Sequence, residues 1–181
     1  MKKKYKNLIV IIMVVIVILC ISLFYFLARY YNNAQHYLHK GVDLETDFLE
    51  EFPGNYTEIL WVKQDDVAVF LGVYGEREGA CYAYYEKVPF FDRWMKRQDG
   101  MLRKDNPSVK LQTGGFYHSN RVYVSLNLEN ISEIEATADG KEKRFGTEPG
   151  KTFVVVMEDE FDDIVFLTED GEEIPEKKFL E

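Results

Sequence analysis

The sequence is poor in the residues that build disulfide frameworks and most metal centres. Only two of the 181 residues are cysteine and three are histidine. Cys20 lies inside a long apolar run and Cys81 in the polar remainder, so a membrane-spanning run would place them in different compartments and no intrachain disulfide is predicted. We expect Cys81 to be a buried free thiol. No cofactor is predicted, because phosphate-loop, dinucleotide, zinc-spacing and catalytic-triad signatures are all missing.

The three histidines form no recognisable ligand set. His36 and His39 stand one helical turn apart, but no third ligand lies at a known spacing, so we interpret them as polar residues of a stalk. His118 precedes Ser119 without a nucleophile-elbow sequence, and adjacent residues of a strand point to opposite faces. The sequence therefore predicts neither a metal centre nor a catalytic histidine.

Acidic residues are missing from the first 40 positions. These positions hold six Lys and Arg residues, which leaves 22 − 6 = 16 basic and all 31 acidic residues beyond them, a balance of −15. A field of that sign repels the phosphates of DNA, RNA and anionic lipids. Nucleic-acid binding is therefore excluded as an expected function.

Charged residues are also missing between Leu8 and Leu27, where the chain is apolar apart from Ser22. About 20 apolar residues span the hydrocarbon core of a bilayer, whereas a cleaved signal has a shorter apolar region and a small-residue cleavage site. We predict a cytoplasmic N-terminus (1–7), an uncleaved transmembrane anchor (8–28) and a juxtamembrane stalk (29–42).

Lysines cluster on one side of this run, at positions 2, 3, 4 and 6, and only Arg29 and Lys40 follow it. Positive residues concentrate on the cytoplasmic side of membrane segments. Tyr25, Phe26, Tyr30 and Tyr31 lie where the helix would leave the bilayer, as interfacial aromatics do. The expected location is a plasma membrane, crossed once, with residues 43–181 extracytoplasmic.

The remainder is predicted to be a mainly β domain. Asp43 suits the cap of a short helix whose apolar face is Leu44, Phe48, Leu49 and Phe52. The period then changes to that of strands in a meander over 57–63, 67–75 and 79–88. Residues 89–115 are less regular and are predicted to form a long loop with one short helix.

The last third shows strand patterns separated by turn signals. Residues 121–128 alternate as a half-buried strand does, and 131–138 and 141–145 flank Asp139-Gly140, a hairpin dipeptide. Unbroken apolar runs at 152–157 and 164–167 predict strands covered on both faces, and Asp170-Gly171 predicts a further turn. The predicted fold is an antiparallel immunoglobulin-like sandwich or meander, with no cysteine framework of a true immunoglobulin domain.

Two stretches carry a resemblance to known proteins, namely DDVAVFLG (65–72) and GKTFVVVM through DIVFLTEDGEEI (150–174). They resemble small single-pass membrane-anchored or secreted β-domain proteins of Gram-positive bacteria. That group has no known activity, so the resemblance implies a bacterial cell-surface location and no site residues.

Acidic residues crowd positions 158–163 and 169–173, which raises two alternatives. Calcium takes carboxylate ligands, but the spaced acidic loop of calcium-binding helices is missing. An envelope hydrolase would need two converging carboxylates, and with 31 acids some pair approaches by chance.

The least ordinary segment gathers positive charge and aromatic rings in an otherwise acidic domain. The composition of Phe91, Arg93, Trp94, Lys96 and Arg97 is that of interface hot spots. The competing interpretation is that Phe90, Phe91 and Trp94 close the core while the cations face water. The leading hypothesis is a non-catalytic, membrane-anchored domain that binds a protein or envelope polymer there. The alternatives are a small hydrolase using paired carboxylates and an accessory subunit acting through its transmembrane helix.

Overall fold

The computed structural model describes residues 2–32, 36–37, 43–88, 93–112, 121–158 and 161–180. Contacts between Cα atoms divide the chain into two compact units, 1–35 and 36–181.

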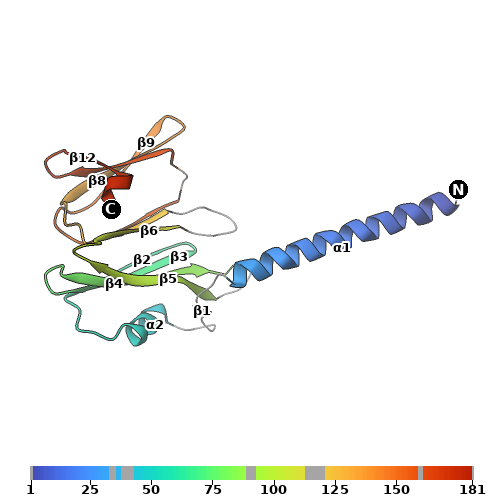
Figure 1. Ribbon diagram of the computed structural model, residues 1–181, viewed down its shortest axis with the longest axis horizontal. Helices are drawn as coiled ribbons and strands as arrows, with labels where there is room; N and C mark the ends of the chain where they lie inside the picture. The colour runs from blue at the N-terminus through green and yellow to red at the C-terminus, as the bar shows by residue number, and fades with distance from the viewer. Residues whose placement is uncertain are drawn as a thin grey trace. The chain divides into compact units, whose positions relative to one another are not determined.

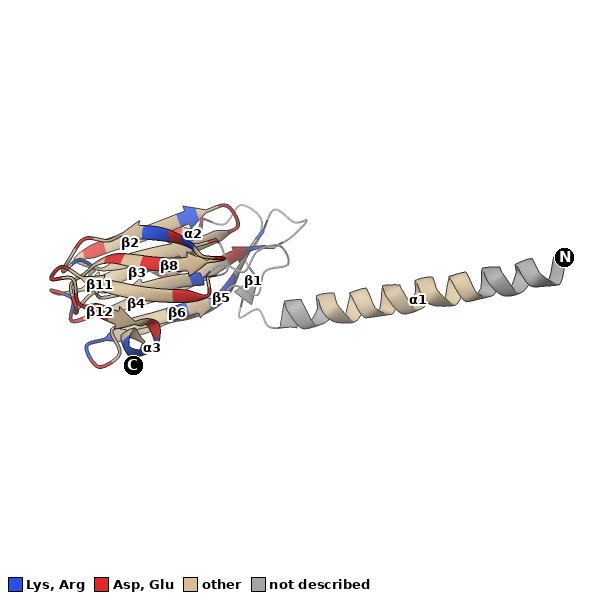
Figure 2. Ribbon diagram, turned by 90° about the horizontal axis from the view of Figure 1, so that it is seen from above, with Lys and Arg blue, Asp and Glu red and all other residues tan. Residues whose placement is uncertain are grey.

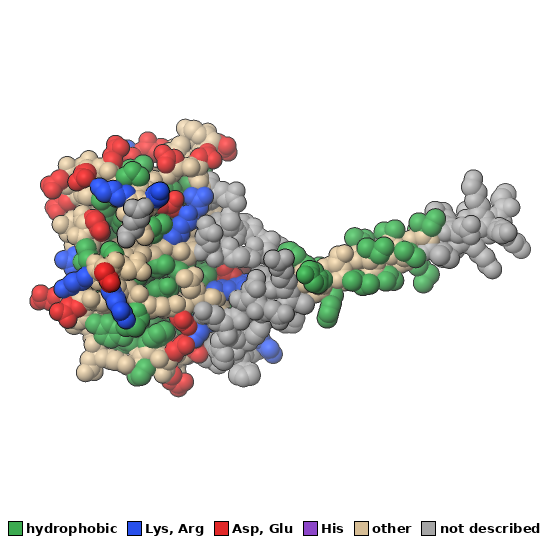
Figure 3. Space-filling view, in the orientation of Figure 1, with side chains coloured by type: hydrophobic (Ala, Val, Ile, Leu, Met, Phe, Trp, Pro, Cys, Tyr) green, Lys and Arg blue, Asp and Glu red, His purple; other side chains and the backbone are tan. Residues whose placement is uncertain are grey.

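The first unit is built on one helix, α1 (Lys2–Asn32). Its side chains are described from Ile11 to Leu27, and those from Ile11 to Phe26 are exposed, as the green side chains along this helix in Figure 3 show. In the described part of the chain, no helix has both the length and the apolar character needed to cross a membrane.

The second unit is mainly antiparallel β, as the sequence predicts. Its described residues form three sheets, in which every strand pair is antiparallel. The elements are β1 (His36–Tyr37), α2 (Leu44–Glu51), β2 (Glu58–Gln64), β3 (Val67–Tyr74), β4 (Gly79–Lys87), β5 (Trp94–Arg103), β6 (Ser108–Gln112), β7 (Arg121–Ser125), β8 (Ile131–Ala138), β9 (Lys141–Gly146), β10 (Phe153–Met157), β11 (Asp163–Thr168), β12 (Glu173–Pro175) and α3 (Glu176–Phe179).

The three sheets stack in layers. Sheet A has the strand order β1-β5-β4-β3-β2, sheet B β10-β7-β6 and sheet C β12-β11-β8-β9. One apolar cluster lies between sheets A and B, a second between sheets B and C, and a third between sheet A and α2. Figure 1 shows α2, sheet A, β6 and sheet C one above another. Sheet B is thus covered on both faces, whereas α2 covers the outer face of sheet A only in part.

The predicted meander is confirmed in β2, β3 and β4, which pair in sequence order. The first connection is a two-residue turn in which Asp65 has φ +45°. The predicted short helix is also confirmed: the Asp43 side chain accepts a hydrogen bond from the Glu45 amide, which satisfies a free N–H at the helix start. Phe48 is fully buried beneath the helix, whereas Leu49 is exposed.

The predicted turns of the last third are confirmed. Asp139 and Gly140 have φ values of +50° and +70° and join β8 to β9 in a tight hairpin, and Gly171 has φ +80° before β12. The run at 152–157 becomes β10, which contributes to both the first and the second apolar cluster, so its two-sided burial is confirmed as well.

The predicted loop at 89–115 is wrong. It contains the ten-residue strand β5 and the strand β6. The apolar period is hidden in β5 because two of its interior positions, Lys96 and Arg97, are cations that acidic side chains neutralise inside the domain. A β-bulge also shifts the register between Tyr84 and Tyr85, which breaks the alternation.

Two burial predictions are wrong because the domain has three sheets where a sandwich has two. Strand β7 was expected to be half-buried, but Val122, Tyr123 and Val124 are each 0% exposed since sheet B is covered on both faces. Strand β11 was expected to be covered on both faces, but Val165 and Leu167 are only partly buried because sheet C is an outer layer.

Two residues of the predicted stalk, His36 and Tyr37, form β1 and pair with Lys96 and Met95 of β5. Cys81 is a buried free thiol, which confirms that prediction.

Candidate functional site

The structure separates the predicted partner-binding residues. Phe91 lies outside the described residues, as do Phe90 and two of the three histidines, His39 and His118. Arg93 is exposed just before β5, and Trp94 is half-buried as the first residue of that strand. Lys96 and Arg97 do not face water.

The side chain of Lys96 lies beneath α2. Its side chain is 7% exposed and pairs with Glu51 of the helix and with Asp99, 3.5 Å away on β5. The same side of α2 binds β4, since the Tyr85 hydroxyl donates to Asp47 at 2.8 Å. Burial and the adjacent Asp47 carboxylate raise the pKa of Tyr85 above its usual range, so the tyrosine stays a donor. These contacts fix α2 on the sheet.

Arg97 belongs to a second buried group. Its Nε lies 2.6 Å from Glu86, whose side chain is 4% exposed, and the Tyr84 hydroxyl donates to the same carboxylate at 2.5 Å. Arg97 and Glu86 therefore stabilise the packing of β5 on β4. A partner could reach neither charge without opening the domain.

Trp94 remains accessible and gains neighbours from β2. The Lys63 ammonium lies over the Trp94 ring, 5.2 Å from its centroid, in a cation–π contact. Trp61, two residues before Lys63 on the same face of the strand, is 59% exposed, and Ile59 is 39% exposed. Ile59, Trp61, Lys63 and Trp94 are called the tryptophan face below. It carries both tryptophans of the chain.

The tryptophan face has a rigid base. Trp61 stacks on Phe70 with centroids 6.2 Å apart and planes 13° apart, and Phe70 stacks in turn on Phe48 of α2 at 5.7 Å. Large rings held in place by a packed core lose little side-chain entropy on binding, which suits them to act as anchors. The helix covers Phe70 and leaves Trp61 open.

The sequence interpretation found Trp94 and missed Trp61, Ile59 and Lys63. One signal was present: Ile59, Leu60, Trp61 and Val62 are consecutive apolar residues, so both faces of this strand are apolar. If such a strand begins a meander, it lies at an edge, where one of the two apolar faces is poorly covered.

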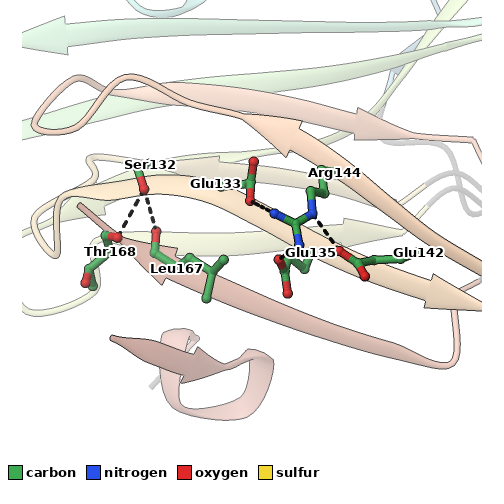
Figure 4. A network of polar contacts seen from close by, with 7 residues as sticks. All are labelled: Ser132, Glu133, Glu135, Glu142, Arg144, Leu167 and Thr168. Atoms are coloured by element: carbon green, nitrogen blue, oxygen red, sulfur yellow. Dashed lines mark hydrogen bonds and ion pairs between the residues drawn. The ribbon is translucent and has the colours of Figure 1, made fainter. Parts of the chain in front are cut away.

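Carboxylates gather elsewhere, on the outer face of sheet C. Arg144 of β9 lies 3.0 Å from Glu133, 2.6 Å from Glu135 and 2.5 Å from Glu142, and Figure 4 shows the three converging on one guanidinium. Their side chains are 32%, 27% and 50% exposed. These three carboxylates are solvated and share one permanent cation. The general acid of a hydrolase instead needs a carboxyl shielded from water.

The turns that raised the calcium alternative give no site in the described residues. Among these, no group of three or more His, Cys, Asp or Glu side chains could hold a metal ion, and Asp159 and Glu160 lie outside them. Figure 2 shows acidic residues, in red, spread over strands and turns of the domain.

No family model, curated protein or solved structure matches this chain.

Proposed function

We propose that this protein is a single-pass membrane protein whose β domain lies outside the cell and binds a partner protein through the tryptophan face. The observation that carries the binding role is the exposure of Trp61, 59%, on a stacked aromatic base. Its role is non-catalytic: the domain offers a rigid recognition surface, and the anchor keeps that surface at the membrane.

The anchoring part rests on the sequence. Leu8 to Leu27 is an uncharged apolar run of bilayer length, four lysines precede it, and the resemblance to membrane-anchored Gram-positive surface proteins favours the same location. The helical backbone of α1 supports it, since a helix satisfies its own backbone hydrogen bonds in lipid.

The binding part rests on the composition and setting of the tryptophan face. Tryptophan is the residue most enriched in interface hot spots, and exposed apolar groups on a rigid base gain more from burial than flexible ones. Lys63, fixed over Trp94, adds one positive charge to an acidic domain. A protein partner with an apolar patch and an acidic rim fits this surface.

The test is capture of partners by the full-length tagged chain and by Trp61→Ala and Trp94→Ala variants. We expect each substitution to weaken capture at least tenfold, the effect of about 1.4 kcal/mol. The matched control is Met101→Ala, because Met101 is also exposed, at 52%, on the same face of sheet A but outside the tryptophan face. Equal losses for Met101→Ala and Trp61→Ala would contradict the proposal, and a captured wall polymer would replace the protein partner.

The membrane orientation has its own test. A membrane-impermeant thiol reagent should label Met101→Cys in intact cells and should leave a cysteine placed at Lys3 unlabelled until the cells are opened. The reverse pattern would contradict the orientation, and recovery of the chain in the soluble fraction would contradict the anchor. If capture survives replacement of the domain but not of residues 8–28, the helix is the binding element.

A further inference from the structure

Strand β2 is an unusually open sheet edge. Among the described residues, β2 pairs only with β3, so one side of its backbone has no strand partner. Natural edge strands are protected by charges, prolines, bulges or shortness. Over its seven residues β2 has no proline and two charged side chains, Glu58 and Lys63, near its ends.

Four of the other described edges have such protection. Strand β9 carries Lys141, Glu142, Lys143 and Arg144, β6 has Lys110 at its centre, β12 has three residues and ends in a proline, and β1 has two residues. The remaining edge, β10, is uncharged but has five residues, against seven in β2. Strand β2 is therefore the longest of the described edge strands, and its central residues 59–62 carry no charge.

The hairpin geometry shows which backbone groups are open. Gln64 and Val67 close a two-residue turn, so they exchange both backbone hydrogen bonds, and every second residue before Gln64 also bonds to β3. The N–H and C=O groups of the alternate residues Ile59, Trp61 and Lys63 therefore point to the open edge. These residues also contribute their side chains to the tryptophan face.

We propose that two copies of this chain associate by antiparallel pairing of their β2 strands about a two-fold axis at Trp61. In that register Trp61 lies opposite its own copy and Ile59 opposite Lys63, so the open groups form about six backbone hydrogen bonds, two for each pair. Sheet A then continues across the axis, and the two tryptophan faces become one surface. This pairing is independent of the proposed partner binding.

The sequence of β2 suits a second copy as the occupant. In the two-fold register the opposite residues are Glu58 with Gln64, Ile59 with Lys63, Leu60 with Val62 and Trp61 with Trp61, so no two like charges face each other. Each pair also has both side chains on one face of the sheet, as a continuous sheet requires. Elsewhere the two acidic domains repel, so added salt should strengthen this association.

Cross-linking of the full-length chain tests the register. In a Cys20→Ser background, where the remaining Cys81 is fully buried, a short bismaleimide should join Trp61→Cys chains into a product of twice the chain mass. The matched control is Met101→Cys, equally exposed but away from β2, which should give no such product. The absence of the product at position 61, equal yields at both positions, or an adduct of Trp61→Cys with a different protein would each overturn the proposal.

Proline substitution separates backbone pairing from side-chain contact. Because the Ile59 amide points outward, Ile59→Pro should keep β2 paired with β3 and lower the Trp61→Cys cross-link to the level of the Met101→Cys control. Ile59→Thr keeps the amide and should retain the cross-link. A cross-link unchanged by Ile59→Pro, in a chain whose unfolding temperature is retained, would overturn strand pairing. Lys63→Pro gives the same test should Ile59→Pro fail to fold.

Discussion

Lys96 of β5 and Glu51 of α2 form an ion pair that fastens the helix to the sheet beneath it. The lysine side chain is 7% exposed and the glutamate 37%, so the cation is the buried member. Loss of the glutamate would leave the ammonium paired with Asp99, 3.5 Å away.

Glu51→Gln should lower the free energy of unfolding by about 1–2 kcal/mol, less than the full cost of orphaning a buried charge because Asp99 remains. Lys96→Met should cost less, since it removes the buried charge together with its need for a partner. Urea denaturation measures both. Glu50→Gln, an exposed neighbour on α2, is the control, and an equal loss in that variant would show that helix propensity is the cause.

Glu86→Ala should be the most destabilising charge deletion in sheet A. It removes the carboxylate 2.6 Å from Arg97 and 2.5 Å from the Tyr84 hydroxyl, in a region where both charged side chains are at most 10% exposed. A loss of about 3–5 kcal/mol is expected, measured by chemical denaturation. By contrast Arg144→Ala, at an exposed ion-pair network, should have a small effect that vanishes at high salt.

Asn127 connects two loops from the interior. Its side chain is 0% exposed, accepts from the Ile131 amide at 2.6 Å and donates to the Ile131 and Glu148 carbonyls at 3.0 Å each. Its φ of +52° also favours asparagine over most residues. Asn127→Ala should therefore cost about 2–4 kcal/mol of stability. Thermal unfolding against Asn130→Ala, which changes an exposed residue of similar φ, separates the buried bonds from the backbone conformation.

Glu176 predicts a pH dependence. Burial raises its pKa, but hydrogen bonds from Lys110 and Tyr123 outweigh burial and hold the pKa below the ordinary value of 4.5. A carboxyl with a lowered folded-state pKa stabilises the fold above its unfolded pKa, and this contribution is lost as pH falls through the folded value. The stability difference between the natural chain and Glu176→Gln should be constant near neutral pH and should shrink below pH 4.5. A difference that grows in acid would contradict this assignment.

Local patterns predicted much of the fold. Strands β2, β3 and β4, the cap at Asp43 and the hairpin at Asp139-Gly140 each depend on a few adjacent residues, so the sequence alone identifies them. Strand β5 could not be found this way. Its interior cations are compatible with a strand only because Glu51 and Glu86 approach from other elements, and no periodicity reveals such distant pairing.

The candidate site was predicted only in part for the same reason. Composition alone indicated Trp94, and the cation that contacts it, Lys63, comes from β2, which β3 and β4 separate from β5. The exposure of Trp61 depends on two tertiary facts, that β2 is an edge strand and that α2 covers Phe70 but not the neighbouring ring. The first fact has a local signal in the consecutive apolar residues 59–62, and the second has none.

The two-sided burial of sheet B has a consequence for how the chain acquires its structure. Val122 and Val124 of β7 complete the first apolar cluster, while Tyr123 between them completes the second, and β10 must arrive from 30 residues later to pair with all three. Neither apolar cluster can be completed before β10 is available. Long-range contacts must therefore form together, and folding should be slow and cooperative. A chain crossing a membrane from its N-terminal side would therefore remain unfolded, and open to proteases, until nearly its whole length had emerged.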